Sequence, residues 1–188
     1  MKVSFVRARY PSVWEPTNLM YVSAFIKDRY GGNLEVQILD GFFDSDEQIL
    51  NKISCSDYVG FSGTTPQVPH IKKLSKLVKE EYPSMKTVAG GYGPSLQPFL
   101  FLNDPTIDYL IVGEGEQSML DILNGAATQK LVSNQPIMDV DSIPNPDRDS
   151  IDLNHYISIA EKDEGRRVTS IMTERGCAFG CTFCAEGE

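Results

Sequence analysis

Apolar, strand-like segments alternate with helix-like segments five times over the first 126 residues, and this alternation constrains the fold more than any other feature. The expected strands cover residues 2–8, 34–40, 57–63, 86–91 and 107–116. The expected helices cover residues 17–30, 44–53, 69–82, 95–102 and 116–125, the fourth being interrupted by a proline. Such alternation predicts a parallel sheet with helices on both faces, joined by right-handed crossovers. Five strands favour the flavodoxin-like order 2-1-3-4-5, so we expect a Rossmann-like α/β fold.

The sequence changes in character after residue 126. Residues 127–165 carry Pro136, Pro144 and Pro146 and show little periodicity, which is typical of a linker that wraps or spans. Residues 166–188 then offer one more strand, "VTSIMT", that leads into a cysteine-rich loop. We therefore predict three parts: a Rossmann-like domain over 1–126, a linker over 127–165, and the start of a second domain.

Charge and hydropathy exclude several classes of protein. The net charge of −9 disfavours general binding to nucleic acid, because an acidic surface repels phosphate backbones. The sequence contains no apolar run of about 18 residues and no signal-peptide pattern at its start. We expect a cytoplasmic protein without a membrane partner.

Small and polar residues gather where the third, fourth and fifth strands end. In an open parallel sheet, ligands bind outside the carboxyl ends of the strands. The candidate ligand-binding residues are Ser62, Gly63, Thr64, Thr65, Gly90, Gly91, Tyr92, Gly113 and Glu114. Ordinary strand-to-helix turns use the same residue types, so this pattern alone leaves both interpretations open. The absence of a G-x-G-x-x-G run after the first strand argues against a dinucleotide.

Three of the four cysteines, Cys177, Cys181 and Cys184, follow a C-x3-C-x2-C spacing on one loop. Thiolates are soft ligands that select zinc or iron–sulfur clusters. Structural zinc requires four protein ligands, whereas three thiolates on a [4Fe–4S] cube leave one iron open. We therefore favour an iron–sulfur cluster. The remaining cysteine, Cys55, is expected to be a buried structural thiol.

The segment "CAFGCTFC" (177–184) resembles the CxxxCxxC signature of radical S-adenosylmethionine enzymes, and the preceding "VTSIMTERG" looks like the first strand of their barrel. The resemblance implies that Cys177, Cys181 and Cys184 hold a [4Fe–4S] cluster and that S-adenosylmethionine chelates the open iron. It further implies that Phe183 lies near the adenine. An electron donor such as flavodoxin or ferredoxin would be the partner.

The upstream part is similar to the cobalamin-binding branch of the same superfamily. "SGT" (62–64) and "GG" (90–91) match two of that branch's motifs, and "PNPDRD" (144–149) matches its linker. The D-x-H-x-x-G motif is absent, because Asp40 has no histidine two residues later. This agrees with a branch that usually binds cobalamin without a protein histidine. His70 is expected to start a helix on a solvent face rather than to ligate cobalt.

The resemblance implies radical methyl transfer to an unactivated carbon or phosphorus, with ring rearrangement or cyclisation as the next reaction class. Glu114 and Glu116 are expected to serve a turn and a helix N-cap rather than acid catalysis. A barrel needs on the order of 200 further residues, so we expect a truncated chain that does not complete the reaction alone. One alternative is a stand-alone module that binds cobalamin or a small ligand. Another is a methylthio-transferring relative, which would need more cysteines within 1–126 than Cys55.

Overall fold

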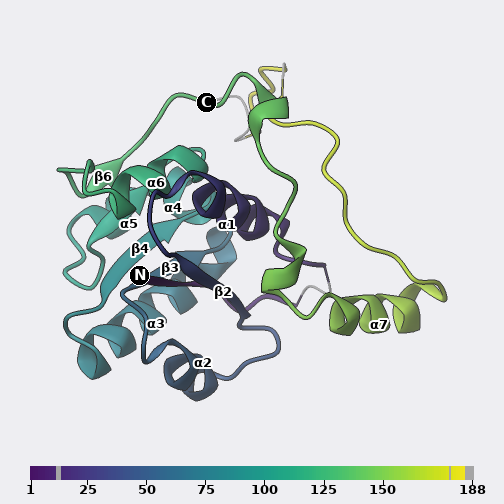
Figure 1. The fold of residues 1–188 in the computed structure, drawn as a ribbon, viewed down its shortest axis with the longest axis horizontal. Helices are drawn as coiled ribbons and strands as arrows, with labels where there is room; N and C mark the ends of the chain where they lie inside the picture. Colours follow the sequence, from purple (N-terminus) through teal and green to yellow (C-terminus); the bar gives the residue numbers. More distant parts are fainter. Residues whose placement is uncertain (12–13, 178, 185–188) are drawn as a thin grey trace.

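The computed structural model describes residues 1–11, 14–177 and 179–184, and within them six parallel strands form one sheet (Figure 1). The order is β2-β1-β3-β4-β5-β6, which confirms the flavodoxin-like order of the first five strands. The strands are β1 (Lys2–Arg7), β2 (Glu35–Asp40), β3 (Tyr58–Ser62), β4 (Lys86–Gly90), β5 (Tyr109–Ile111) and β6 (Leu131–Val132). The prediction of five strands was wrong by one, because the two residues of β6 are too few to show a strand periodicity.

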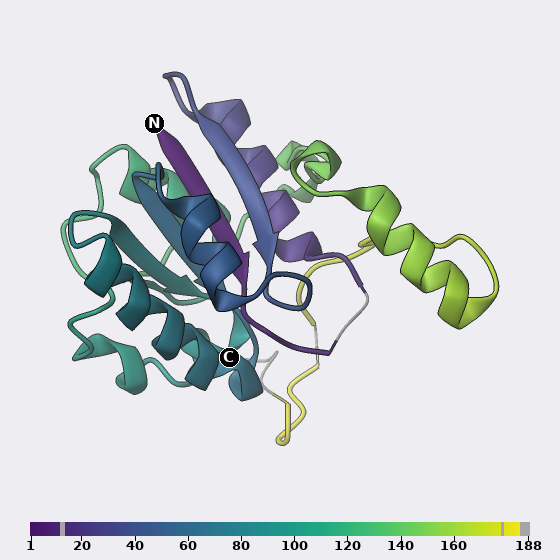
Figure 2. The same ribbon diagram turned by 90° about the horizontal axis from the view of Figure 1, so that it is seen from below.

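Helices cover both faces of the sheet, as predicted (Figure 2). They are α1 (Thr17–Arg29), α2 (Asp46–Ile53), α3 (Val68–Glu81), α4 (Tyr92–Leu96), α5 (Phe99–Leu102) and α6 (Glu116–Leu123). Helices α1 and α6 bury apolar side chains such as Ile26 and Met119 against one face. Helices α2, α3 and α5 bury Ile49, Leu74 and Phe101 against the other. Among the described residues, no helix is long and apolar enough to cross a membrane.

The segment after α6 runs along the outside of α1 before it forms a further helix. Asp147 fixes this path, since its backbone N–H donates to the Met20 carbonyl and its carboxylate accepts from Ser23 Oγ (2.5 Å) and Lys27 Nζ (2.6 Å). Helix α7 (Leu153–Glu164) was not predicted within the linker. Its hydrophobic periodicity is weak, and it is stabilised by contacts with the sheet rather than by its own pattern.

Helix α7 is docked on the carboxyl end of β2 by a buried polar cluster. The Tyr156 hydroxyl donates to Asp40 Oδ2 (2.6 Å), and Arg7 of β1 donates to both oxygens of the same carboxylate. Phe43 packs edge-on against Tyr156 at 5.0 Å between ring centroids. Burial and the hydrogen bond to Asp40 raise the pKa of the Tyr156 phenol, so it remains a donor.

Two local predictions were wrong. No strand forms over 166–177, where "VTSIMT" was expected to be one, because the described part of the chain offers no neighbouring strand to pair with its backbone. Cys55 is exposed rather than buried, since it lies in the turn between α2 and β3, outside the apolar periodicity of both.

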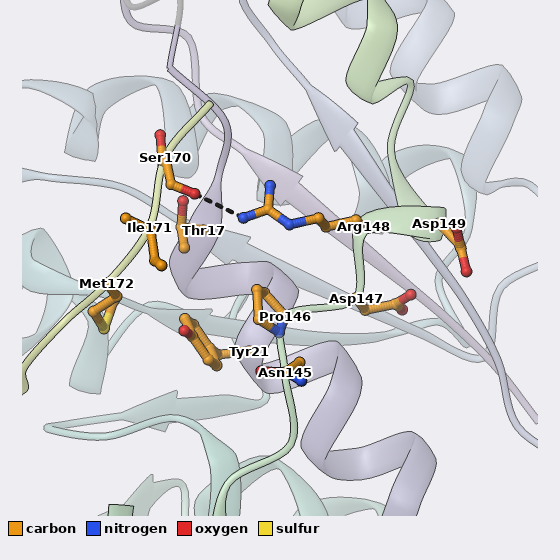
Figure 3. Close-up of a pocket in the computed structure, with 10 residues that line it drawn as sticks. All are labelled: Thr17, Tyr21, Asn145, Pro146, Asp147, Arg148, Asp149, Ser170, Ile171 and Met172. Carbon is orange, nitrogen blue, oxygen red and sulfur yellow. Dashed lines mark hydrogen bonds between the residues drawn. The ribbon is translucent and has the colours of Figure 1, made fainter. Parts of the chain in front are cut away.

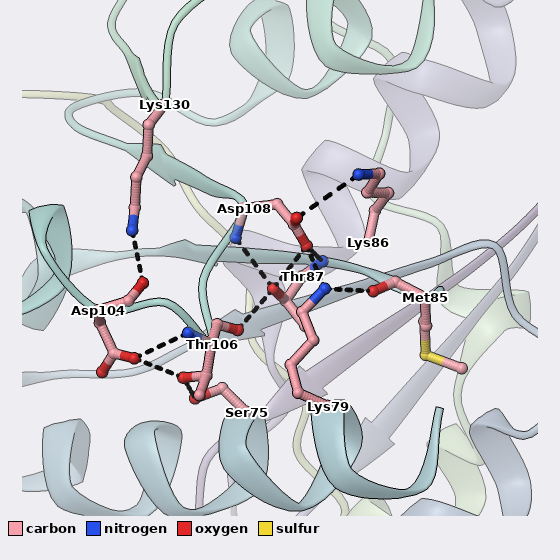
Figure 4. A network of polar contacts seen from close by, with 9 residues as sticks. All are labelled: Ser75, Lys79, Met85, Lys86, Thr87, Asp104, Thr106, Asp108 and Lys130. Carbon is pink, nitrogen blue, oxygen red and sulfur yellow. Dashed lines mark hydrogen bonds and ion pairs between the residues drawn. The ribbon is translucent and has the colours of Figure 1, made fainter. Parts of the chain in front are cut away.

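A polar network closes the amino ends of β4 and β5, at the edge of the sheet opposite the candidate site (Figure 4). Asp108 Oδ2 accepts from Lys79 Nζ (2.6 Å), from the Thr87 N–H (2.8 Å) and from Thr87 Oγ1 (3.0 Å). Thr87 Oγ1 also donates to the Thr106 carbonyl, and the Thr106 hydroxyl bonds Ser75 Oγ. Burial alone would raise the pKa of Asp108, but the hydrogen bonds from Lys79 and Thr87 outweigh it and lower the pKa. The network therefore holds an ionised carboxylate.

We expect Asp108→Ala to lower the free energy of unfolding by about 2–4 kcal/mol, because a partly buried ammonium and a buried N–H lose their acceptor together. Urea unfolding at pH 7 measures the change. The matched control is Glu80→Ala, which removes an exposed pair with Lys76 and should cost less than about 1 kcal/mol. Equal losses in the two variants would contradict this role for Asp108.

Candidate cofactor site

Three loops meet at the carboxyl edge of the sheet, where β3, β4 and β5 end. The Gly93 N–H donates to the Gly63 carbonyl (2.9 Å), which joins the β4 loop to the β3 loop. The Gly113 N–H donates to Ser95 Oγ (3.1 Å), which joins the β5 loop to α4. The structure thus brings together the residues that the sequence selected after these three strands.

The β3 loop is also joined to the β1 side of the sheet through Ser62. Its side chain is buried, and its Oγ accepts from Asn18 Nδ2 of α1 (2.9 Å). The Ser62 carbonyl accepts from the Ala8 N–H (2.9 Å). The Ser62 hydroxyl therefore joins the β3 loop to α1.

Gln67 fixes the backbone of the β3 loop. Its Oε1 accepts from the Thr64 N–H (2.7 Å) and from Thr64 Oγ1 (3.0 Å), and its Nε2 donates to the Ala8 carbonyl. Thr65 starts the 3₁₀ helix η1 (Thr65–Gln67) and is exposed. Thr64 and Thr65 therefore present polar groups at a fixed edge.

The outer surface of this edge is open and aromatic. Tyr10, Trp14, Phe42 and Tyr92 follow the carboxyl ends of β1, β2 and β4 and are exposed, Tyr92 by 53%. A Cβ placed on Gly113 would meet nothing within 4 Å. We call these five residues the edge patch.

Gly91 occupies a backbone conformation that other residues rarely adopt, with φ 86° and ψ −175°. A Cβ there would lie 2.6 Å from Ser62 Oγ and 3.1 Å from the Gly63 carbonyl oxygen. The glycine lets the β4 loop pass close to the β3 loop.

We expect Gly91→Ala to lower the free energy of unfolding by about 1–3 kcal/mol and to displace the β3 loop. Gly125→Ala is the matched control, because Gly125 also has a positive φ but open space around it, so only the strain of about 1 kcal/mol applies. Thermal unfolding of both variants measures the difference. Identical stability losses would show that the approach of the two loops does not require the glycine.

His70 lies beside the site, but its ring is already engaged. Nδ1 accepts from the Arg9 N–H (2.7 Å), and Nε2 bonds Asp46 Oδ1 (3.0 Å). The side chain is mostly buried, so the expectation of a solvent-facing His70 was wrong. Arg9 and Lys73 pair with the same Asp46 carboxylate. The cluster ties the β1 loop to α2 and α3.

Burial would raise the pKa of Asp46, but hydrogen bonds from Lys73 and His70 lower it to about 2 from an ordinary 3.8. Because the pKa of Asp46 is lower in the folded than in the unfolded protein, the ionised carboxylate stabilises the fold fully at pH values above its unfolded pKa. This contribution disappears as the pH falls from about 4 to 2. We expect Asp46→Asn to remove about 2 kcal/mol of this pH dependence. Urea unfolding at pH 5 and pH 2.5 measures the change in the free energy of unfolding between the two pH values. The same change in wild type and Asp46→Asn would contradict the role of Asp46.

The segment before the cysteines crosses the carboxyl edge. Ser170 donates to Glu15 in the β1 loop, and Arg175 donates to Glu116 at the start of α6. Glu116 is not an N-cap, as had been expected: Gly115 occupies that position, and the Glu116 side chain is buried against Arg175. The Glu114 carboxylate accepts from the Ile137 N–H (2.9 Å) and lies 3.6 Å from Arg175.

Cys177, Cys181 and Cys184 are all exposed and follow Arg175 directly along the chain. The Cys184 N–H donates to the Cys181 carbonyl (3.0 Å), forming a turn. Within residues 1–11, 14–177 and 179–184, no group of three or more His, Cys, Asp and Glu side chains gathers as a metal site. The three thiols therefore share one accessible loop without being assembled, and Phe183 on that loop is 93% exposed.

A cavity of about 480 Å³ is lined by residues of α1, of the linker and of the segment before the cysteines (Figure 3). It opens between the start of α1, residues 145–149 and residues 170–172, and the side chain of Arg148 reaches across it to Ser170. None of the predicted ligand-binding residues lines it. The cavity separates the linker from the segment that leads to the cysteines.

Sequence reasoning missed several residues that organise this edge, namely Glu15, Asn18, Gln67, Gly93 and Arg175. Only the role of Gln67 had a local sequence signal among these residues, because Thr64-x-x-Gln67 matches a capping-box pattern. The pairing of Arg175 with Glu116, 59 residues apart, has no local signature.

Comparison with known proteins agrees with this geometry. Residues 3–123 match the family model described as "B12 binding domain". Over 99% of the chain, the sequence is 27% identical to an anaerobic magnesium-protoporphyrin IX monomethyl ester cyclase of Rubrivivax gelatinosus. Over 90%, it is 28% identical to an uncharacterized methyltransferase of Pyrococcus horikoshii, and over 93% it is 27% identical to a cytidylyl-2-hydroxyethylphosphonate methyltransferase of Streptomyces wedmorensis.

The chain covers 39%, 40% and 44% of the lengths of these three relatives. The family match spans β1 to α6, which is the part of the chain that builds the sheet and the three loops at its carboxyl edge. The chain belongs to the B12-binding domain family.

Proposed function

We propose that this chain is the cobalamin- and cluster-bearing part of a B12-dependent radical S-adenosylmethionine enzyme whose reaction is radical methyl transfer. One observation carries the proposal: the segment leading into the cysteine loop crosses the same edge of the sheet that bears the loops of the B12-binding domain. The two elements that the chemistry requires are therefore neighbours.

The edge patch fits a cobalamin. A corrin is broad and largely apolar, and an open edge with exposed aromatic side chains provides a matching surface. Gly113 leaves room above the edge, Thr65 is exposed, and the Thr64 hydroxyl, which donates to Gln67, can still accept from a polar group on the corrin rim. Both ring nitrogens of His70 already have partners, which supports binding without a histidine ligand to cobalt.

The donor set on the loop fits an iron–sulfur cluster. Cys177, Cys181 and Cys184 would hold three irons and leave the fourth open to S-adenosylmethionine, with Phe183 beside the adenine. Their exposure allows them to converge when a cluster binds. A flavodoxin- or ferredoxin-type donor would supply the electron. When bound, methylcobalamin would supply the methyl group and S-adenosylmethionine the radical that activates the substrate.

Two of the three relatives reported above are named as methyltransferases and one as a cyclase, which supports methyl transfer with ring formation as the second candidate. A stand-alone module that binds cobalamin without chemistry of its own is the alternative. The cysteine loop distinguishes it, because such a module needs no thiolates.

Electron paramagnetic resonance of the anaerobically reconstituted and reduced protein tests the proposal. We expect a signal from a reduced [4Fe–4S] cluster whose g values shift when S-adenosylmethionine is added, because the cofactor coordinates the open iron. 5′-Deoxy-5′-methylthioadenosine, which lacks the amino and carboxylate groups that would chelate the iron, is the control ligand and should leave the g values unchanged. A cluster spectrum that does not change when S-adenosylmethionine is added would overturn the assignment to radical chemistry. It would favour the alternative of a stand-alone module that binds cobalamin.

A further inference from the structure

We propose that Glu15 and Glu116 form a two-point clamp that holds residues 169–175 across the carboxyl edge, and so fix the position of the cysteine loop relative to the cobalamin site. The purpose assigned to the clamp rests on the proposed function, whereas its existence does not. Both glutamates are positioning residues.

The first point is Glu15, in the loop between β1 and α1. Its side chain is buried and accepts from Thr169 Oγ1 (2.5 Å), Ser170 Oγ (2.5 Å) and the Ser170 N–H (3.3 Å). Burial would raise the pKa of this carboxyl, but the hydrogen bonds from Ser170 and Thr169 outweigh it and lower the pKa. A buried charge with three donors from one dipeptide holds that dipeptide strongly.

Arg148 secures the same dipeptide from the other side. Its Nη1 donates to Thr169 Oγ1 (2.9 Å), and its Nη2 donates to the Ser170 carbonyl (2.7 Å; Figure 3). The linker and the β1 loop thus both hold residues 169–170. These contacts fix the position from which the chain continues toward Arg175.

The second point is Glu116, the first residue of α6. Its side chain is 4% exposed. The helix N-terminus and Arg175 offset the negative charge of its buried carboxylate. Arg175 donates to Glu116, lies 3.6 Å from Glu114, and stacks over the Tyr21 ring at 5.4 Å. Burial would lower the pKa of Arg175, but the bond to Glu116 raises it. Removing Arg175 would leave a buried carboxylate without its cation.

The two points belong to different connections at the edge, since Glu15 lies between β1 and α1 and Glu116 begins α6 after β5. Four residues lie between Ser170 and Arg175, so the Cα atoms of these two residues are at most about 18 Å apart. Cys177 follows Arg175 by two residues, so its Cα lies within about 7 Å of the Arg175 Cα. A clamp of this kind determines where the cluster loop begins.

Trypsin cleavage after Arg175 reports directly on the contact between Arg175 and Glu116, because trypsin requires an accessible arginine side chain. Arg175 is 17% exposed, whereas the Arg167 side chain is 61% exposed and serves as an internal reference. We expect the ratio of cleavage after Arg175 to cleavage after Arg167 to be at least about tenfold lower in the folded protein than in a synthetic peptide of residues 160–184.

Glu116→Ala should raise this ratio to within about threefold of the peptide value, because Arg175 then loses its buried hydrogen-bond acceptor and keeps only the longer contacts with Glu114 and the Tyr21 ring. Glu80→Ala, on the outer face of α3, should leave it unchanged. Where Glu116→Ala fails to fold, Glu15→Ala and the wild-type ratio decide the matter, since Glu15→Ala should free residues 169–170 and raise the cleavage ratio severalfold. A wild-type ratio equal to that of the peptide would overturn the clamp.

The positioning role has its own readout, the magnetic interaction between cob(II)alamin and the reduced cluster in the doubly loaded protein. We expect a broadened, coupled spectrum for wild type and two independent signals for Glu116→Ala. An identical coupled spectrum in both proteins would overturn the positioning role. If no corrin binds at all, the proposed function fails, and the trypsin ratio still decides whether the clamp exists.

Discussion

Cys177→Ala is expected to abolish cluster assembly: after anaerobic reconstitution the wild-type chain should hold about four irons, and the variant less than a tenth of that amount. Two thiolates cannot hold a [4Fe–4S] cube that already leaves one iron without a protein ligand. The visible absorbance of the cluster should disappear together with the iron. Cys181→Ala and Cys184→Ala should behave in the same way, because the three ligands act as one set.

Cys55→Ala is the matched control for these variants. Cys55 is also exposed but lies in the turn between α2 and β3, outside the cysteine loop. Its removal should leave the iron content and spectrum at wild-type levels. Loss of iron in Cys55→Ala, or retention of a full complement in Cys177→Ala, would contradict the assignment of the ligands.

The largest expected effect on stability comes from Asp40, whose carboxylate accepts from Arg7 and Tyr156 within the fold. Its side chain is 5% exposed and that of Arg7 is 13% exposed. Asp40→Ala removes the carboxylate from a buried guanidinium and from a buried phenol, so the free energy of unfolding should fall by about 3–5 kcal/mol. Chemical denaturation at pH 7 measures the loss.

Asp44→Ala is the control for Asp40, since Asp44 pairs with Lys52, whose side chain is half exposed. Breaking that pair should cost less than about 1 kcal/mol. Because Tyr156 belongs to α7, Asp40→Ala should also speed proteolysis within α7 before the sheet unfolds. A loss as small as that of Asp44→Ala would show that the cluster does not hold α7 to the sheet.

The sheet and its order were predictable because β1 to β5 are apolar segments joined by short helical connections, of which α2, α3 and α6 have clear amphipathic periodicity. The candidate loops were predictable for a related reason, since residues after parallel strands must share one edge. Strand β6 and helix α7 were not predictable, because β6 has two residues and α7 is held by the contact of Tyr156 with Asp40 rather than by its own pattern.

The remaining errors share a physical origin in contacts between residues far apart in the sequence. His70 was expected to face solvent because the sequence does not show Asp46 and Arg9 converging on its ring. Glu116 was expected to cap a helix, and instead its buried carboxylate pairs with Arg175. The segment before the cysteines was expected to be a strand, and its backbone has no neighbouring strand. Local patterns specify elements, whereas these pairings depend on the folded arrangement.

Retention of hydroxocobalamin decides whether the carboxyl edge of the sheet binds a corrin. The protein, Gly113→Phe and Gly125→Phe are each incubated with the corrin under anaerobic conditions, separated by gel filtration and read by absorption. Both glycines have a positive φ and open surroundings, but Gly113 lies at the carboxyl edge and Gly125 beyond the other end of α6. We expect about one corrin per chain for wild type and Gly125→Phe, and less than a tenth of that for Gly113→Phe. A colourless wild-type protein, or equal retention by both variants, would contradict it.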